Sequence, residues 1–96
     1  MRFLERLSQL REAIRSAATA NGAEDIRVFG SVARGQERDE SDIDFLVSLK
    51  PGRSLLDLAR LELRLEELLG HPVDVVTTNG LREPIRSIAL REAVRV

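Results

Sequence analysis

Apolar residues recur every three or four positions over the first twenty residues of the chain, with arginine and glutamate between them. This spacing predicts an amphipathic helix. We expect the helix to end at Asn21-Gly22, because glycine readily adopts the left-handed conformation found at helix C-termini. The apolar positions of this helix are Phe3, Leu4, Leu7, Leu10, Ile14, Ala17 and Ala18.

Three short runs rich in β-branched and other apolar residues predict strands at 26–29, 43–49 and 73–77. The first run leads directly into Gly30-Ser31, and Pro-containing turns flank the other two. The polar stretch 34–41 has too few apolar residues to be an element in its own right. We expect it to form a short helical turn and a loop.

A second long helix is predicted to begin after Ser54, with Asp57 completing a variant of the capping box. Gly70 marks its end. One side of this helix is expected to lie in the core, through Leu55, Leu58, Leu61, Leu65, Leu68 and Leu69.

Asn79-Gly80 predicts a turn, and the segment 81–94 predicts a last helix. The apolar face of this helix is expected to comprise Ile85, Ile88 and Ala89. Three strands and three main helices indicate a small α/β or α+β domain spanning 1–96, with helices flanking the sheet. Because no long helix joins the first two strands, these can pair in either direction, and the sheet is mixed or undecided.

The amino-acid composition excludes several kinds of functional site. The chain has no cysteine, which excludes disulfides, zinc–thiolate sites and cysteine nucleophiles. No apolar run approaches the ~20 residues of a membrane span, and the charged start does not resemble a signal peptide, so we expect a cytoplasmic protein. The 15 basic and 16 acidic residues give a net charge of −1, which argues against direct nucleic-acid binding.

Three aspartates lie in or directly beside the predicted strands. Asp42 and Asp44 are two residues apart at the start of a strand, so their side chains point to the same face. Asp74 lies inside the third predicted strand, between two valines. Because neighbouring carboxylates repel one another, a bound cation would explain all three. Mg²⁺ prefers such oxygen ligands and often shares its coordination shell with phosphates.

Gly30 and Ser31 follow the first strand, and ten residues separate Ser31 from Asp42. Glycine lets the backbone approach a phosphate closely, and the amide groups of a turn that opens a short helix can bind an anion. Ser31 can equally act as a helix cap. Arg34 and Arg38 can contact phosphates or be ordinary solvated loop charges. We interpret His71, far along the chain from the acids, as structural, and Phe29 and Phe45 as core residues.

The segments 28–35 (VFGSVARG), 41–47 (SDIDFLV) and 73–76 (VDVV) together resemble the signature of the DNA polymerase β-like nucleotidyltransferase superfamily. More narrowly, the chain is similar to minimal nucleotidyltransferases, the antitoxin partners of HEPN-domain toxins. The resemblance implies a polymerase β-like palm fold. It also implies roles for the site residues: Gly30, Ser31 and Arg34 would bind nucleotide, Asp42 and Asp44 would bind Mg²⁺, and Asp74 would complete the metal and catalytic site.

The activity that this resemblance implies is Mg²⁺-dependent transfer of AMP from ATP to a tyrosine of a cognate HEPN ribonuclease toxin, with release of pyrophosphate. The chain contains no tyrosine, so the acceptor must lie elsewhere. Two alternatives remain open from the sequence. One is an antitoxin that occludes its toxin without catalysis, and the other is a nucleotidyltransferase acting on a small molecule.

Overall fold

The computed structural model describes residues 3–96, which contain a four-stranded sheet in the order β3-β2-β1-β4. The strands are β1 (Ala23–Phe29), β2 (Ile43–Leu49), β3 (Val73–Thr77) and β4 (Val94–Arg95). β1 runs antiparallel to both β2 and β4, whereas β2 and β3 are parallel. The sheet is therefore mixed, and the predicted α+β class is confirmed.

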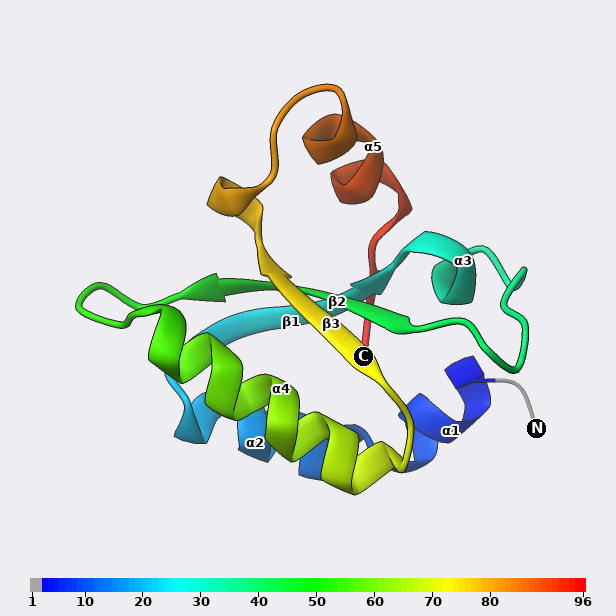
Figure 1. Ribbon diagram of the computed structural model, residues 1–96, viewed down its shortest axis with the longest axis horizontal. Helices are drawn as coiled ribbons and strands as arrows, with labels where there is room; N and C mark the ends of the chain where they lie inside the picture. Colours follow the sequence, from blue (N-terminus) through cyan, green and yellow to red (C-terminus); the bar gives the residue numbers. More distant parts are fainter. Residues whose placement is uncertain (1–2) are drawn as a thin grey trace.

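Three helices cover one face of the sheet: α1 (Phe3–Gln9), α2 (Arg11–Ala20) and α4 (Leu55–Leu69) (Figure 1). The main hydrophobic core lies between these helices and the strands, because alternate residues of each strand point to this face. Its largest fully buried side chains include Leu7, Ile14, Val28, Ile43, Phe45, Leu61 and Leu65.

The other face of the sheet carries η1 (Thr78–Gly80) and α5 (Ile85–Glu92), and α3 (Gly30–Ala33) lies at the end of β1 (Figure 1). Leu46 and Ala89 are buried but do not belong to the main core cluster. Leu46 points to the same side of β2 as Asp44. A smaller apolar contact thus lies on this second face, the side on which α5 packs.

The α4 helix has the predicted termini. The Ser54 hydroxyl accepts a hydrogen bond from the Leu56 amide at 3.3 Å, and the Asp57 carboxylate accepts one from the Ser54 amide at 3.0 Å. That second bond is the main reason why the pKa of Asp57 is lowered. Gly70 ends the helix with a φ of 61°. Leu55 departs from the prediction, because its side chain is 81% exposed and lies outside the core.

The N-terminal helix is divided at Leu10 rather than continuous. Leu10 has φ −100° and ψ 12°, which lie outside the helical range, although its amide still bonds to the Arg6 carbonyl. The periodic apolar pattern runs through this residue without interruption and therefore carries no signal of the break. No helix in residues 3–96 is long and apolar enough to cross a membrane.

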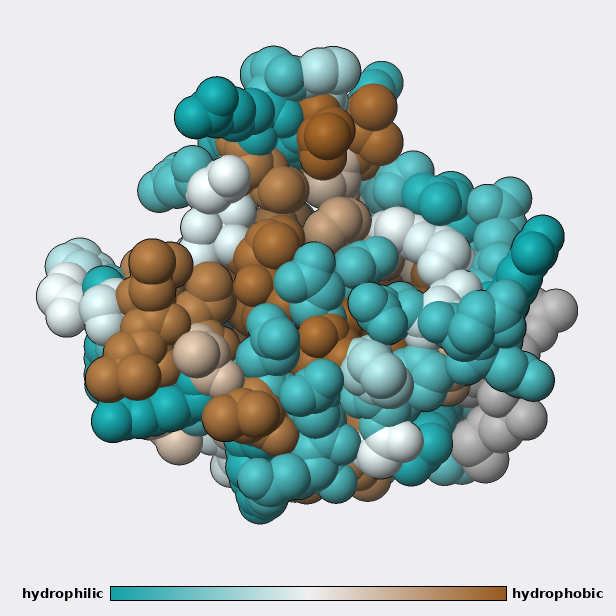
Figure 2. All heavy atoms as spheres, viewed as in Figure 1, coloured by the Kyte–Doolittle hydropathy of each residue, from teal (hydrophilic) through white to brown (hydrophobic). Residues whose placement is uncertain are grey.

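The predicted helix 81–94 is wrong at both ends, since α5 covers only 85–92. Pro84 directly precedes it, and the residue before a proline is disfavoured in the α conformation. Of the three predicted core residues, only Ala89 is buried. Ile85 and Ile88 are 59% and 43% exposed, and Figure 2 shows apolar atoms at the surface over α5 and over the start of α4.

Candidate active site

The structure brings the three predicted aspartates to one face of the sheet. Asp44 on β2 and Asp74 on β3 are direct neighbours across the parallel pair, so both side chains point to the α5 side. Asp42 lies two residues before Asp44, just outside β2. Asp42 and Asp74 are exposed, and Asp44 is partly buried.

The three carboxylates and a nearby arginine act on one another electrostatically. Burial raises the pKa of the Asp44 carboxyl above its usual range, and the neighbouring carboxylates of Asp74 and Asp42 raise it further. The Arg34 guanidinium acts in the opposite direction and lowers it. Negative charge is thus concentrated around Asp44, and a bound cation would relieve the repulsion.

The donor chemistry of this cluster fits a hard divalent cation, because carboxylate oxygens are the ligands that Mg²⁺ prefers. Within residues 3–96, no three acidic or histidine side chains are placed so that they could hold one cation between them. The cluster therefore supplies suitable ligand types, although the described residues do not form a ready-made three-ligand site.

Two features favour glycine at position 30: the backbone has a positive φ, and the Asp44 side chain leaves no room for a Cβ atom. Gly30 opens α3 with a φ of +73°, a conformation that side chains rarely allow. A Cβ atom at this position would lie 2.6 Å from the Asp44 Oδ2 atom. The glycine turn and the acid cluster are thus in direct contact.

Ser31 lies inside α3 and does not cap it. The N-cap residue is Phe29, and no side chain forms a capping hydrogen bond there. The capping alternative for Ser31 is therefore not observed. The amide groups in the first turn of a helix have no intrahelical acceptor, so they remain available to an anion beside Asp44. The helical turn predicted within 34–41 occurs earlier, at α3 itself.

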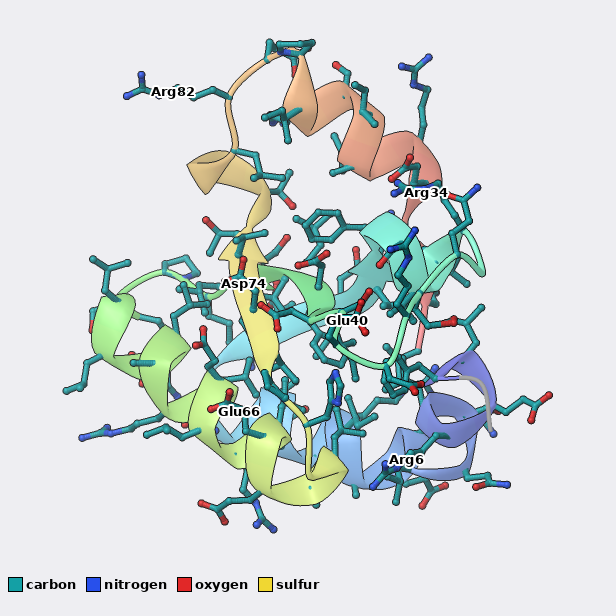
Figure 3. All side chains as sticks on the ribbon, turned by 45° about the vertical axis from the view of Figure 1, so that its right-hand side comes forward. Arg6, Arg34, Glu40, Glu66, Asp74 and Arg82 are labelled. Carbon is teal, nitrogen blue, oxygen red and sulfur yellow. The ribbon has the colours of Figure 1, made fainter. Side chains whose placement is uncertain are left out.

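Arg34 directly follows α3 and is not an isolated loop charge. Its Nη1 atom donates to both carboxylate oxygens of Glu92, at 2.8 and 2.9 Å, and its Nε atom donates to the Gln36 side chain at 2.9 Å. Figure 3 shows Arg34 and Asp74 on the α5 side of the molecule, whereas Arg6 and Glu66 belong to the helices of the other side. Sequence reasoning missed Glu92, because it is distant in the chain and looks like an ordinary surface charge.

His71 is a structural residue, but it lies beside the site. Its Nε2 atom is hydrogen bonded to the backbone carbonyl of Ser41, the residue before Asp42. Its ring also packs against Phe3, with ring centroids 4.5 Å apart. The turn before β3 therefore anchors the segment that carries the first acid. The sequence did not predict this contact, because His71 and Ser41 are 30 positions apart in the chain.

The two phenylalanines within the signature segments, Phe29 and Phe45, have different locations. Phe45 is fully buried in the main core, as predicted. Phe29 is the register partner of Asp44 and does not belong to the main core cluster. The prediction that Phe29 is a core residue is therefore wrong, and its partly buried ring is on the site face. Because successive residues of a strand point to opposite faces, a core position for Val28 already places Phe29 on the other face.

Comparison with known proteins agrees with this geometry. Residues 7–96 match the family model described as nucleotidyltransferase domain. A Methanocaldococcus jannaschii protein named as a predicted protein adenylyltransferase (MJ0435) is 40% identical over 90 residues, covering 94% of this chain and 97% of that protein. Protein adenylyltransferase MntA of Thermococcus cleftensis is 44% identical over 75 residues, covering 78% of this chain and 76% of the relative.

Solved structures give the same result. A protein described as a predicted minimal nucleotidyltransferase superposes with a TM-score of 0.88 and 52% identity, covering 97% of this chain and 95% of that one. A toxin–antitoxin complex crystallised with AMP-PNP shares the fold, with a TM-score of 0.73 and 21% identity over 85% of this chain and 68% of that one. The chain therefore belongs to the nucleotidyltransferase domain family, among its minimal members.

Proposed function

We propose that this nucleotidyltransferase moves AMP from ATP to a hydroxyl group of a partner protein, with Mg²⁺ as cofactor. The observation that carries the proposal is the cluster of Asp42, Asp44 and Asp74 on one sheet face, in contact with the Gly30 turn. Relatives covering most of the chain are named as protein adenylyltransferases, which supports a protein acceptor. We propose further that residues 1–96 act as a single cytoplasmic domain.

The reaction requires one bond to form and one to break. The acceptor oxygen forms a bond to the α-phosphorus of ATP. The bond between the α-phosphorus and the oxygen that bridges it to the β-phosphate breaks, so pyrophosphate leaves with that electron pair. Asp74, the exposed acid on β3, takes the proton of the attacking hydroxyl. Asp42 and Asp44 would hold Mg²⁺, which when bound offsets the negative charge of the phosphates.

The remaining residues of the site bind and orient the nucleotide. The amide groups of Gly30 and Ser31, in the first turn of α3 beside Asp44, would bind the phosphates that leave. The Arg34 guanidinium, whose charge reaches Asp44, would offset phosphate charge on the same side. These contacts fix the α-phosphorus in position, and positioning with charge stabilisation supplies most of the catalysis in phosphoryl-type transfer.

The proposed acceptor is a tyrosine of a HEPN-type ribonuclease toxin. Because the chain has no tyrosine, it cannot modify one of its own. The fold is shared with the antitoxin-containing complex crystallised with AMP-PNP, which supports a toxin as partner and ATP as substrate. The exposure of Asp42 and Asp74 leaves the reacting side accessible to a large acceptor.

The test is incubation of the protein with α-labelled ATP, Mg²⁺ and the toxin encoded beside its gene. We expect label on the toxin, and loss of labelling with Asp42→Asn, Asp44→Asn or a toxin lacking the acceptor tyrosine. Asp39→Asn is the matched control, since it neutralises an exposed acid of the neighbouring loop and should leave transfer unchanged. Unlabelled toxin with the unmodified enzyme, or full labelling by Asp44→Asn, would refute the catalytic proposal.

The second candidate is an antitoxin that occludes its toxin without catalysis. The exposed apolar side chains of Ile85 and Ile88 on α5 favour a protein-binding role, since they contribute nothing to the core. This candidate predicts that the Asp42→Asn/Asp44→Asn double variant still protects cells from the toxin. Loss of protection, with the complex between the two proteins still formed, would exclude it.

A further inference from the structure

The Arg34 side chain is held from two directions. Both carboxylate oxygens of Glu92 accept hydrogen bonds from one nitrogen, Nη1, and Gln36 accepts a bond from Nε. Within the part of the chain that the structure describes, the third nitrogen, Nη2, has no hydrogen-bond acceptor. The guanidinium is thus fixed at two nitrogens and still has one free to donate.

The position of this group links it to the candidate active site. The Arg34 amide donates to the Gly30 carbonyl at 3.1 Å, so the arginine directly follows the turn that contacts Asp44. Glu92 is the last residue of α5 and comes from the far end of the chain. The Arg34–Glu92 contact therefore joins α5 to the segment that directly follows the Gly30-Ser31 turn (Figure 3).

The helix that carries Glu92 is itself fixed against the rest of the domain. Ala89 on α5 is buried, and the Arg86 Nε atom donates to the Thr78 carbonyl of η1 at 3.3 Å. Directly after α5, the strand β4 pairs with β1. Glu92 therefore holds Arg34 from a helix that is packed and hydrogen bonded to the rest of the domain.

A contact of this kind contributes little to folding. The Arg34 and Glu92 side chains are 44% and 24% exposed, and partly exposed ion pairs are weak stabilisers because water screens them. The contact does restrict a long, flexible side chain to one orientation. Ordering such a side chain before a ligand arrives removes a cost that binding would otherwise have to meet.

We propose that Glu92 is a positioning residue that orients Arg34 toward the phosphates of the bound nucleotide. The inference rests on the proposed function and adds to it a residue outside the signature segments. Because Glu92 occupies Nη1 and leaves Nη2 free, the same arginine can contact Glu92 and a phosphate oxygen simultaneously. The Glu92 carboxylate contacts the Arg34 guanidinium, so in this proposal its effect on the nucleotide passes through Arg34.

The experiment measures Mg²⁺-dependent AMP-PNP binding by isothermal titration calorimetry for the full chain and for Glu92→Gln. We expect the dissociation constant to rise about 3- to 10-fold, the range given by the ordering of one long side chain. Glu83→Gln is the matched control, since it removes an acid from the other end of the same helix region and should bind normally. The unfolding temperatures of both variants should stay close to that of the unmodified protein.

A double-mutant cycle shows whether the effect passes through Arg34. In an Arg34→Ala background, Glu92→Gln should weaken AMP-PNP binding no further. In transfer assays, Glu92→Gln should raise the KM for ATP by the same factor and leave kcat nearly unchanged, and Glu92→Asp should restore part of the affinity. An equal loss in the Arg34→Ala background would mean that Glu92 acts by another route, and the proposal would fail.

The outcomes separate this inference from the function on which it rests. Unchanged or tighter AMP-PNP binding by Glu92→Gln refutes the role of Glu92, whatever the transfer assay shows. Absence of toxin labelling, with normal AMP-PNP binding by the unmodified protein, refutes the transfer reaction and leaves the role of Glu92 standing. Absence of AMP-PNP binding by the unmodified protein overturns both.

Discussion

At the scale of single residues, the site has no room for a side chain between a glycine and an acid. Gly30 combines a positive φ with a position where any Cβ would meet the Asp44 carboxylate at 2.6 Å. Gly52 also has a positive φ, of 85°, but nothing lies within 4 Å of the Cβ that alanine would add. A comparison of alanine substitutions at the two glycines therefore distinguishes the effect of backbone strain from that of steric contact.

We expect Gly52→Ala to lower the free energy of unfolding by about 1–2 kcal/mol, the cost of a left-handed alanine. Gly30→Ala should lower it by at least ~1 kcal/mol more, because the new methyl group must displace Asp44. Only Gly30→Ala should also reduce AMP transfer, by roughly 100-fold, since a displacement of about 1 Å in a site has effects of that size. Urea unfolding and the labelled transfer assay measure both, and equal losses of activity in the two variants would contradict this explanation.

Asp44 should make the protein less stable when ionised. Its raised pKa means that the folded state binds the proton more tightly than the unfolded state, so stability falls as pH rises above the ordinary value of 3.8. Asp44→Asn should therefore raise the unfolding temperature at pH 7 by a few degrees. This corresponds to at most about 1 kcal/mol, because solvent screens the partly exposed group.

The gain from Asp44→Asn should disappear below pH 3.8, where the carboxyl is protonated in both states. Thermal unfolding followed by circular dichroism at pH 7 and pH 3 measures the difference. Asp39→Asn, on the exposed loop, provides the comparison and should change the unfolding temperature little at either pH. A lower unfolding temperature for Asp44→Asn at pH 7 would show that the carboxylate stabilises the fold.

At the scale of elements, local chemistry could be predicted and distant contacts could not. The bounds of α4, β2 and β3 follow from neighbouring residues: the Ser54–Asp57 capping box, Gly70, and β-branched runs that end at turns. The strand β4 consists of only two residues and exists because they pair with Arg27 and Val28. No local pattern in 94–95 indicates that pairing.

The candidate site shows the same division. The three aspartates and the glycine–serine turn could be identified because each lies inside a predicted strand or directly beside one. Glu92 and His71 could not be identified, because their partners, Arg34 and the Ser41 carbonyl, are distant in sequence. The location of Ile85 and Ile88 was predicted incorrectly for a related reason: their helical spacing is apolar, but it cannot indicate whether a sheet or solvent faces them.

At the scale of the whole molecule, one face of the sheet packs the main core and the other carries the candidate site. The face covered by α1, α2 and α4 contains the main core and no part of the candidate site. The other face carries the acids, and elements from distant parts of the chain meet there: α3, β2, β3 and α5 (Figure 1). Because the site exists only when all four are assembled, a ligand bound there must stabilise the folded chain as a whole.

Mg²⁺ and ATP together should therefore raise the unfolding temperature of the protein. At a nucleotide concentration 100 times the dissociation constant, the expected stabilisation is about 2.7 kcal/mol. Removal of the metal with EDTA should abolish most of the shift, because the phosphates would then face the carboxylates of Asp42 and Asp44 without a counter-ion. The Asp42→Asn/Asp44→Asn variant should lose the metal-dependent part and be insensitive to EDTA. Thermal unfolding with ATP alone, with Mg²⁺ alone and with both measures these contributions, and an equal shift with and without EDTA would show that the nucleotide binds independently of the acid cluster.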